Sequence, residues 1–467
     1  MNRSFLLAAS VFLAVASSAS AQVVLSQIAE VDVQTSVVGN IGNNPSAIAF
    51  DGTNLYVAGF YNGSPGTTGQ SAMVKISNVL TTPTVGTLFG IDPVTPASRG
   101  YSGLDWHNGF LYAAFDPGSV NANGITCWDA NGTQVWAKSA RGGSSVARDP
   151  GVPGGNPAFG TGIAWTQFAG SAGGPQGRAL QDALTGLDIW GLQTGFSLSS
   201  PTAQYFRDMD FDDQTGDLWY RANNNLYVAR RTGDNAATTA VVALDPETTP
   251  RNMQNVVYVR TPTGSVVLYN DRDAAVTGQL FVDVMRAMRP DGTPDRLDLG
   301  TFSPLAGSAA YDFAYHEPTQ VLAISDFTNR KVYFFNVTVP PSYGYGAGCA
   351  DSSSFVPRHT SSGTLLGGSG VLTLQVDNAT PAAPAFFAFG FGKTQIPLGN
   401  GCDILVGGLS SFFLGPVFTA PGLPGSGAAS APFAVPPGYS GVGFNTQAVV
   451  LDNGAIVLSN GLQTIIP

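Results

Sequence analysis

The chain has 467 residues, of which only 11% are charged, and its formal net charge at neutral pH is -10. An acidic chain lacks the basic surface that phosphate backbones require, which argues against nucleic acid as a partner. Glycine (58) and proline (31) are abundant, and short alternating apolar runs are joined by glycine- and asparagine-rich turns. This pattern predicts an all-β protein.

The first 21 residues have the pattern of a secretory signal peptide. One positive charge in Met1-Asn-Arg3 precedes an apolar run over residues 5–16, and Ala19-Ser-Ala21 supplies a small-residue cleavage site. The apolar run is too short to span a bilayer, and no later segment is long and apolar enough to do so. We therefore expect a mature protein that is secreted, held at the cell surface or periplasmic.

A recurring unit organises residues 22–340. Its plainest copy, residues 46–58, is an alternating strand that ends in an aromatic residue, a tight polar turn and a second apolar strand. The copies align on an aliphatic and an aromatic residue two positions apart, at Ile48/Phe50, Leu104/Trp106, Ile163/Trp165, Met209/Phe211, Val256/Tyr258 and Phe313/Tyr315. Outer strands follow, most clearly on either side of the hairpin turn Asn131-Gly132. Four strands in a unit of about 40 to 50 residues is the period of a propeller blade.

These units predict a six-bladed β-propeller over residues 22–340. A seven-bladed ring is the alternative, if residues 179–197 contain a further blade. The last unit shows only three strands, and a spare alternating stretch, residues 28–33, precedes the first unit. We expect this stretch to pair beside residues 331–335, because a shared terminal strand closes the ring and removes its free sheet edges.

Residues 341–467 form a second predicted domain, a small β-sandwich. Pro340-Pro341 ends the propeller, since proline cannot continue a central strand. Four strands are expected in the second domain, over residues 371–376, 385–389, 447–451 and 456–458. Asn453-Gly454 between the last two strands is a hairpin turn signal.

The chain has three cysteines. Cys349 and Cys402 lie in the second domain in similar glycine-cysteine settings, and an exported protein permits a disulfide. We expect these two to be bonded, at a gain of about 4 kcal/mol in the chain-entropy model. Cys127 is expected to be a buried, reduced strand residue.

The second domain also resembles a known family over about residues 343–467. The resemblance depends on Tyr345-Gly-Ala-Gly-Cys349, the strand over residues 381–391, Gly401-Cys402, the segment 447–452 and Leu458-Ser-Asn-Gly-Leu462. The family is a C-terminal β-sandwich module of exported proteins of environmental bacteria. The sequence departs from it at Cys349-Ala-Asp, where the family often has Cys-Pro-Gly. The resemblance implies a secreted context and no particular reaction, and residues 22–340 resemble propellers in general and no single enzyme family.

Polar residues recur on the first strands of several units. If these strands line a central channel, six carboxylates and imidazoles converge at its mouth: Asp105, His107, Asp208, Asp210, Asp312 and His316. Such ligands suit calcium or a transition metal, so these residues are the candidate metal ligands, with calcium as the cofactor considered. The alternative, which we favour, is that short polar residues fit a crowded axis and cap backbone N–H groups.

No catalytic residue is marked, because the chain has neither a G-x-S-x-G nor an H-E-x-x-H motif. The leading hypothesis is therefore an exported, non-catalytic propeller that acts as a scaffold or binds a protein, glycan or cell-surface ligand. The first alternative is a metal-dependent hydrolase or lactonase with a cation in the channel. The second is a structural component of the cell envelope.

Overall fold

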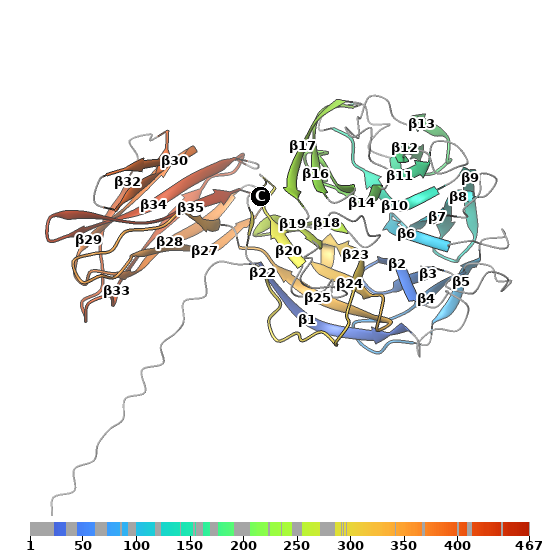
Figure 1. Cartoon of the computed structure of the whole chain (residues 1–467), viewed down its shortest axis with the longest axis horizontal. Coiled ribbons are helices and arrows are strands. Elements are labelled where there is room, and N and C mark those ends of the chain that lie inside the picture. The colour runs from blue at the N-terminus through green and yellow to red at the C-terminus, as the bar shows by residue number, and fades with distance from the viewer. Residues whose placement is uncertain are drawn as a thin grey trace, which may run out of the picture.

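A computed structural model of the chain describes most of the residues from 23 to 466 (Figure 1). The described ranges are 23–33, 44–60, 72–84, 86–91, 100–116, 123–140, 142–152, 155, 162–168, 176–190, 206–222, 225–234, 236–244, 255–270, 285–290, 292, 294–295, 297–340, 342–366, 369–398, 401–408, 413–439 and 442–466. The predicted signal peptide and the glycine-containing segment 61–70 lie outside them.

The described strands up to Thr338 form units of four antiparallel strands placed radially around an axis (Figure 1). We number the units in chain order. Unit 1 consists of β2 (Asn44–Phe50), β3 (Leu55–Phe60), β4 (Ala72–Ile76) and β5 (Thr87–Ile91), and unit 2 of β6 (Gly100–His107), β7 (Phe110–Asp116), β8 (Asn123–Asp129) and β9 (Gln134–Ser139). Unit 3 consists of β10 (Gly142–Asp149), β11 (Gly162–Phe168), β12 (Gln176–Asp182) and β13 (Asp188–Trp190), and unit 4 of β14 (Phe206–Phe211), β15 (Leu218–Ala222), β16 (Asn225–Gly233) and β17 (Ala236–Leu244). Unit 5 consists of β18 (Val256–Thr261), β19 (Gly264–Asn270), β20 (Met285–Met288) and β21 (Pro294–Asp295), and unit 6 of β23 (Ala310–His316), β24 (Val321–Asp326), β25 (Lys331–Thr338) and β1 (Val23–Asp32).

The predicted closing strand is confirmed. β1 runs antiparallel to β25, with Val31 opposite Val332 and Glu30 opposite Tyr333. β22 (Leu297–Asp298) pairs with the other edge of β1. The first described strand thus completes the last described unit, as the missing fourth strand predicted.

The apolar core lies between neighbouring units, because each unit presents an alternating apolar face to the next. One buried cluster joins units 5 and 6, and another joins units 1 and 2. A further cluster packs Val31, Phe334 and Val332 of unit 6 against Phe50 and Val57 of unit 1. Because the last unit packs on the first in this way, the units form a closed β-propeller ring.

The structure shows that the third copy of the sequence repeat was aligned on the wrong strand. Ile163 and Trp165 lie on β11, which pairs with β10 on one side and β12 on the other, so β11 is the second strand of unit 3. The channel side of this unit is β10, where Val146 and Arg148 occupy the aligned positions. The alignment failed here because Arg148 stands where the other copies have an aromatic residue.

Within the described ranges, the strands of residues 342–466 pair among themselves in three separate sheets and with no strand of the ring. One sheet has the order β26 (Ser342–Tyr345), β35 (Ala455–Ile465), β34 (Gly443–Asp452), β29 (Pro384–Gly390) and β32 (Phe413–Phe418). The other has the order β27 (Arg358–Leu366), β28 (Ser369–Ala379) and β33 (Gly427–Val435), and β30 (Gly392–Pro397) pairs with β31 (Asp403–Gly407). A shared buried cluster holds the first two sheets face to face.

Two local predictions in this part are confirmed. Cys349 and Cys402 form a disulfide with a Cα–Cα distance of 4.9 Å, while Cys127 is free and buried. Asn453 and Gly454 both have positive φ, at 50° and 85°, in the turn between β34 and β35. That geometry favours the Asn-Gly pair, because both central residues of a type I′ turn need φ above zero.

Candidate binding site at the channel mouth

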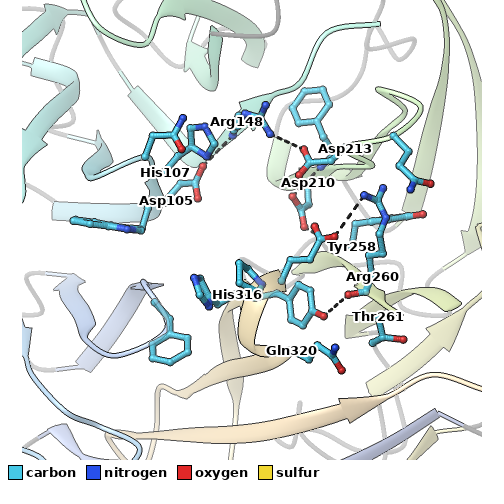
Figure 2. Close-up of a pocket in the computed structure, with 18 of the residues that line it drawn as sticks. Asp105, His107, Arg148, Asp210, Asp213, Tyr258, Arg260, Thr261, His316 and Gln320 are labelled. Atoms are coloured by element: carbon cyan, nitrogen blue, oxygen red, sulfur yellow. Dashed lines mark hydrogen bonds and ion pairs between the residues drawn. The ribbon is translucent and has the colours of Figure 1, made fainter. Parts of the chain in front are cut away.

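The first strands of the six described units surround a channel that opens at one end into a cavity of about 840 Å³, here called the mouth pocket. Every unit contributes to its lining, with Phe50, Trp106, Arg148, Asp210, Arg260 and Tyr315 from units 1 to 6 in turn. Figure 2 shows Asp105, His107 and Arg148 on one side of the pocket and Arg260 and Thr261 on the other. A 3-10 turn, η2 (Glu317–Thr319), forms part of the rim.

The six candidate metal ligands lie on three first strands, as predicted: two each on β6, β14 and β23. Asp105, His107, Asp210 and His316 line the mouth pocket. Asp208 and Asp312 lie deeper, in a cavity of about 80 Å³ within the channel that Asp105 and Asp210 also line. The four carboxylates therefore face the channel from units 2, 4 and 6.

Each of these carboxylates accepts backbone hydrogen bonds from the first strand of the next unit. The N–H of Arg148 in unit 3 donates to Asp105 (3.0 Å), and the N–H of Ile48 in unit 1 donates to Asp312 (2.6 Å). Neighbouring first strands belong to different units and share no ladder here, so their inward N–H groups need other acceptors. The aspartates supply these acceptors and join unit 2 to 3, 4 to 5 and 6 to 1.

The acidic run on β14 is the most regular of these junctions. Val256 N–H donates to Asp208 (3.0 Å) and Tyr258 N–H donates to Asp210 (2.7 Å). Arg260 continues the series by pairing with Asp212 at 2.6 Å. The alternating carboxylates of Asp208, Asp210 and Asp212 thus each bind a group of the first strand of unit 5.

Burial raises the pKa values of the channel carboxyl groups. It raises the pKa of Asp105 to about 6 and holds the pKa of Asp210 well above its ordinary value. Burial also raises the pKa of Asp312, and the neighbouring Asp208 carboxylate raises it further. Removing a carboxylate from water disfavours its charged form, so the neutral acid gains population.

Calcium at these six residues stays a prediction. Within the described ranges, no group of three or more His, Cys, Asp or Glu side chains is arranged to hold a metal ion. The carboxylate oxygens accept N–H groups on fixed strands, whereas calcium needs six to eight oxygen ligands around one point. The observed arrangement therefore fits hydrogen-bond junctions better than a cation cage.

Two arginines at the rim, Arg148 and Arg260, were not predicted from the sequence as site residues. Arg148 pairs with Asp213 at 3.2 Å, and both side chains are about one-third exposed or more. Arg260 pairs with Asp212 and also lies 3.6 Å from Glu317. Arg148 was missed with the whole first strand of unit 3, and Arg260 because it lies two residues beyond the aligned aromatic position.

An aromatic wall completes the pocket. The Trp106 indole stacks on the buried Tyr56 ring, with centroids 4.6 Å apart and an interplanar angle of 11°. Trp106 is only partly buried and lines the mouth pocket. Tyr56 covers one face of the indole, and Trp106 contributes part of its remaining surface to the lining of the cavity.

Both histidines of the pocket favour the neutral form. Burial and the nearby Arg148 lower the pKa of His107 to about 4. Burial also lowers the pKa of His316, whose Nδ1 lies 2.8 Å from Thr319 Oγ1. A neutral imidazole has one donor and one acceptor nitrogen, so each histidine offers both functions.

No protein-family model matches the chain, and no curated protein matches its sequence. Among solved structures it is similar to the C-terminal WD40 domain of Sif2, with 10% sequence identity and a TM-score of 0.37 over 68% of this chain and 99% of that domain. So weak a likeness carries no functional inference, and the propeller assignment depends on the strand order and ring closure. Within the ranges that the structure describes, no helix is long and apolar enough to cross a membrane.

Proposed function

We propose that this chain is an exported, non-catalytic β-propeller that binds a ligand in the mouth pocket. The observation that carries the proposal is a cavity of about 840 Å³ to which every described unit contributes side chains. Small-molecule sites commonly have volumes of about 300 to 1,000 Å³. The wall strands are cross-linked by the aspartate junctions, so the site has a rigid frame.

The wider organisation is part of the same proposal. Residues 1–21 are a signal peptide, residues 22–340 a six-bladed propeller, and residues 341–467 a β-sandwich module that belongs to the family it resembles. The Cys349–Cys402 bond supports an oxidising, extracytoplasmic location. The partner is a glycan, protein or cell-surface ligand, and the acidic net charge of -10 disfavours nucleic acid.

A blocking substitution tests the binding proposal. Gln214 lines the pocket, is exposed and lies on the turn after β14, so Gln214→Trp fills the mouth without removing a core side chain. Gln134→Trp on the outer strand β9 is the matched control, because Gln134 is also exposed and does not line the pocket.

The measurement is a thermal-shift screen of the full chain against neutral sugars, amines, carboxylic acids and nucleotides. We expect at least one class to raise the melting temperature of the wild type and of Gln134→Trp, but not of Gln214→Trp. Stabilisation that survives in Gln214→Trp, or no stabilisation by any class, would contradict the proposal.

A metal-dependent hydrolase or lactonase is the second candidate. One observation favours it, since Asp105, His107, Asp210 and His316 line one pocket. Elemental analysis of the purified chain tests it, together with thermal unfolding in calcium and in chelator. Stoichiometric metal, with calcium stabilisation lost in Asp208→Asn/Asp210→Asn, would favour the enzyme over the binding protein.

A further inference from the structure

The mouth pocket combines a flat apolar surface with groups that both donate and accept hydrogen bonds. Trp106 supplies the flat surface, and its stacking on Tyr56 fixes the orientation of the indole. Tyr56 is itself anchored, because its hydroxyl donates to Asp51 (3.1 Å). An aromatic face fixed in this way can stack on a ligand at little cost in side-chain entropy.

Donors and acceptors alternate around the rim. Arg148 and Arg260 are donors only, and the Asp213 and Glu317 carboxylates next to them are acceptors when ionised. Gln214 carries an amide that both donates and accepts. A ligand that satisfies neighbouring donors and acceptors must itself carry groups with both functions, and the hydroxyl group is the simplest of these.

Carboxyl groups outnumber the arginines at the pocket. Arg148 and Arg260 face the carboxyl groups of Asp105, Asp210, Asp213 and Glu317 in the lining, and Arg260 also pairs with Asp212. Burial raises the pKa of all four, to about 6 for Asp105 and well above the ordinary value for Asp210. With both histidines neutral, the pocket has no excess of positive charge that would select an anion.

We propose that the mouth pocket binds a neutral sugar, with a pyranose ring stacked on Trp106 and its hydroxyls bonded to the arginine–carboxylate pairs at the rim. This inference rests on the proposed binding function and names its ligand class. The C–H face of a pyranose is flat and apolar, so it matches the indole. Its hydroxyls donate to Asp213 and Glu317 and accept from Arg148 and Arg260.

The test is saturation-transfer NMR followed by calorimetric titration of the full chain. The probes are the methyl glycosides of glucose, galactose, mannose and N-acetylglucosamine and the β-1,4-linked disaccharides of glucose and N-acetylglucosamine. The wild type should bind at least one probe saturably. Trp106→Ala should weaken that binding about tenfold or more, and Trp106→Phe should lose less because it keeps an aromatic ring.

Two further variants separate the pocket chemistry from loss of fold. Asp213→Asn should weaken the same sugar several-fold, because the rim loses an ionised acceptor. Asp188→Asn is its matched control, since Asp188 forms a similar exposed ion pair with Lys138 on the outer strands and lies away from the pocket. Every variant must keep the wild-type far-UV circular dichroism, and Gln214→Trp blocks the pocket if Trp106→Ala does not fold.

Each outcome decides the inference. Sugar binding that falls with Trp106→Ala, Asp213→Asn and Gln214→Trp supports it. Binding of an amine or another class that Gln214→Trp blocks, with no sugar binding, overturns the sugar assignment and leaves the binding function standing. Sugar binding insensitive to the pocket variants overturns the assignment to this pocket, and no binding of any class overturns both proposals.

Discussion

Asp105 illustrates how a single side chain serves both the frame and the pocket. Its carboxylate accepts the N–H of Arg148 from the next unit, while the same residue lines the mouth pocket. Sequence reasoning placed Asp105 at the channel, because the aligned first strands share one orientation. It could not supply the partner, since the strand that carries Arg148 was aligned on the wrong segment.

The raised pKa of Asp105 predicts a pH effect with a definite sign. The folded pKa of about 6 lies above the ordinary value of 3.8, so the fold favours the protonated acid. Its contribution to stability is complete below pH 3.8 and is lost as the pH rises through about 6.

Asp105→Asn should therefore flatten the fall in unfolding free energy between about pH 4 and pH 6, measured by urea denaturation. Asp188→Asn, at an exposed ion pair, should leave the fall unchanged. An identical pH profile for the wild type and Asp105→Asn would show that this carboxyl group is not perturbed by burial.

At the scale of elements, the alternating first and second strands were predictable because aliphatic and aromatic residues recur at fixed offsets. The closing strand was predictable because the last unit lacked a fourth strand. The first strand of unit 3, β10, was not predictable, because it begins with two glycines and has Arg148 at the position where the other copies have an aromatic residue. The rim pairs of Arg148 and Arg260 depend on which strands face each other across the channel, and a linear sequence does not carry that information.

The closing strand gives a prediction with an internal control. Val31 is 2% exposed between units 6 and 1, whereas Ile28 on the same strand is 42% exposed. Val31→Asp buries an unpaired carboxylate and should lower the unfolding free energy by about 3 kcal/mol or more. Ile28→Asp should change it by less than about 1 kcal/mol. Equal effects of the two substitutions in urea denaturation would contradict ring closure by β1.

The disulfide of the C-terminal part gives another prediction. Cys349 and Cys402 are 53 residues apart in sequence, so their bond should stabilise this part by about 4 kcal/mol. Reductant should therefore lower the melting temperature of the wild type and of Cys127→Ala, but not that of Cys402→Ser. Loss of the reductant effect in Cys127→Ala instead would mean that the free thiol exchanges into the bond.

At the scale of the whole molecule, the ring and the C-terminal sheets are joined at Val339 and Pro340. Thr263 of unit 5 donates to the Val339 carbonyl, and Arg289 donates to the Pro340 carbonyl (3.1 Å) while its guanidinium lies 4.8 Å from the Tyr343 ring centroid. These contacts fix the chain as it leaves the ring. Thr263 Oγ1 also lies 3.1 Å from Oγ1 of Thr261, which lines the mouth pocket, so the junction lies next to the rim of the pocket.

The central claim is that the channel carboxylates join neighbouring units and that the mouth pocket binds the ligand. The most direct measurement is calorimetric titration of the full chain, first with calcium chloride and then with the methyl glycosides and disaccharides. We expect no saturable calcium heat that depends on Asp208 and Asp210, and a saturable sugar heat that Trp106→Ala removes. A saturable calcium heat lost in Asp208→Asn/Asp210→Asn, with no sugar heat that depends on the pocket, would contradict it.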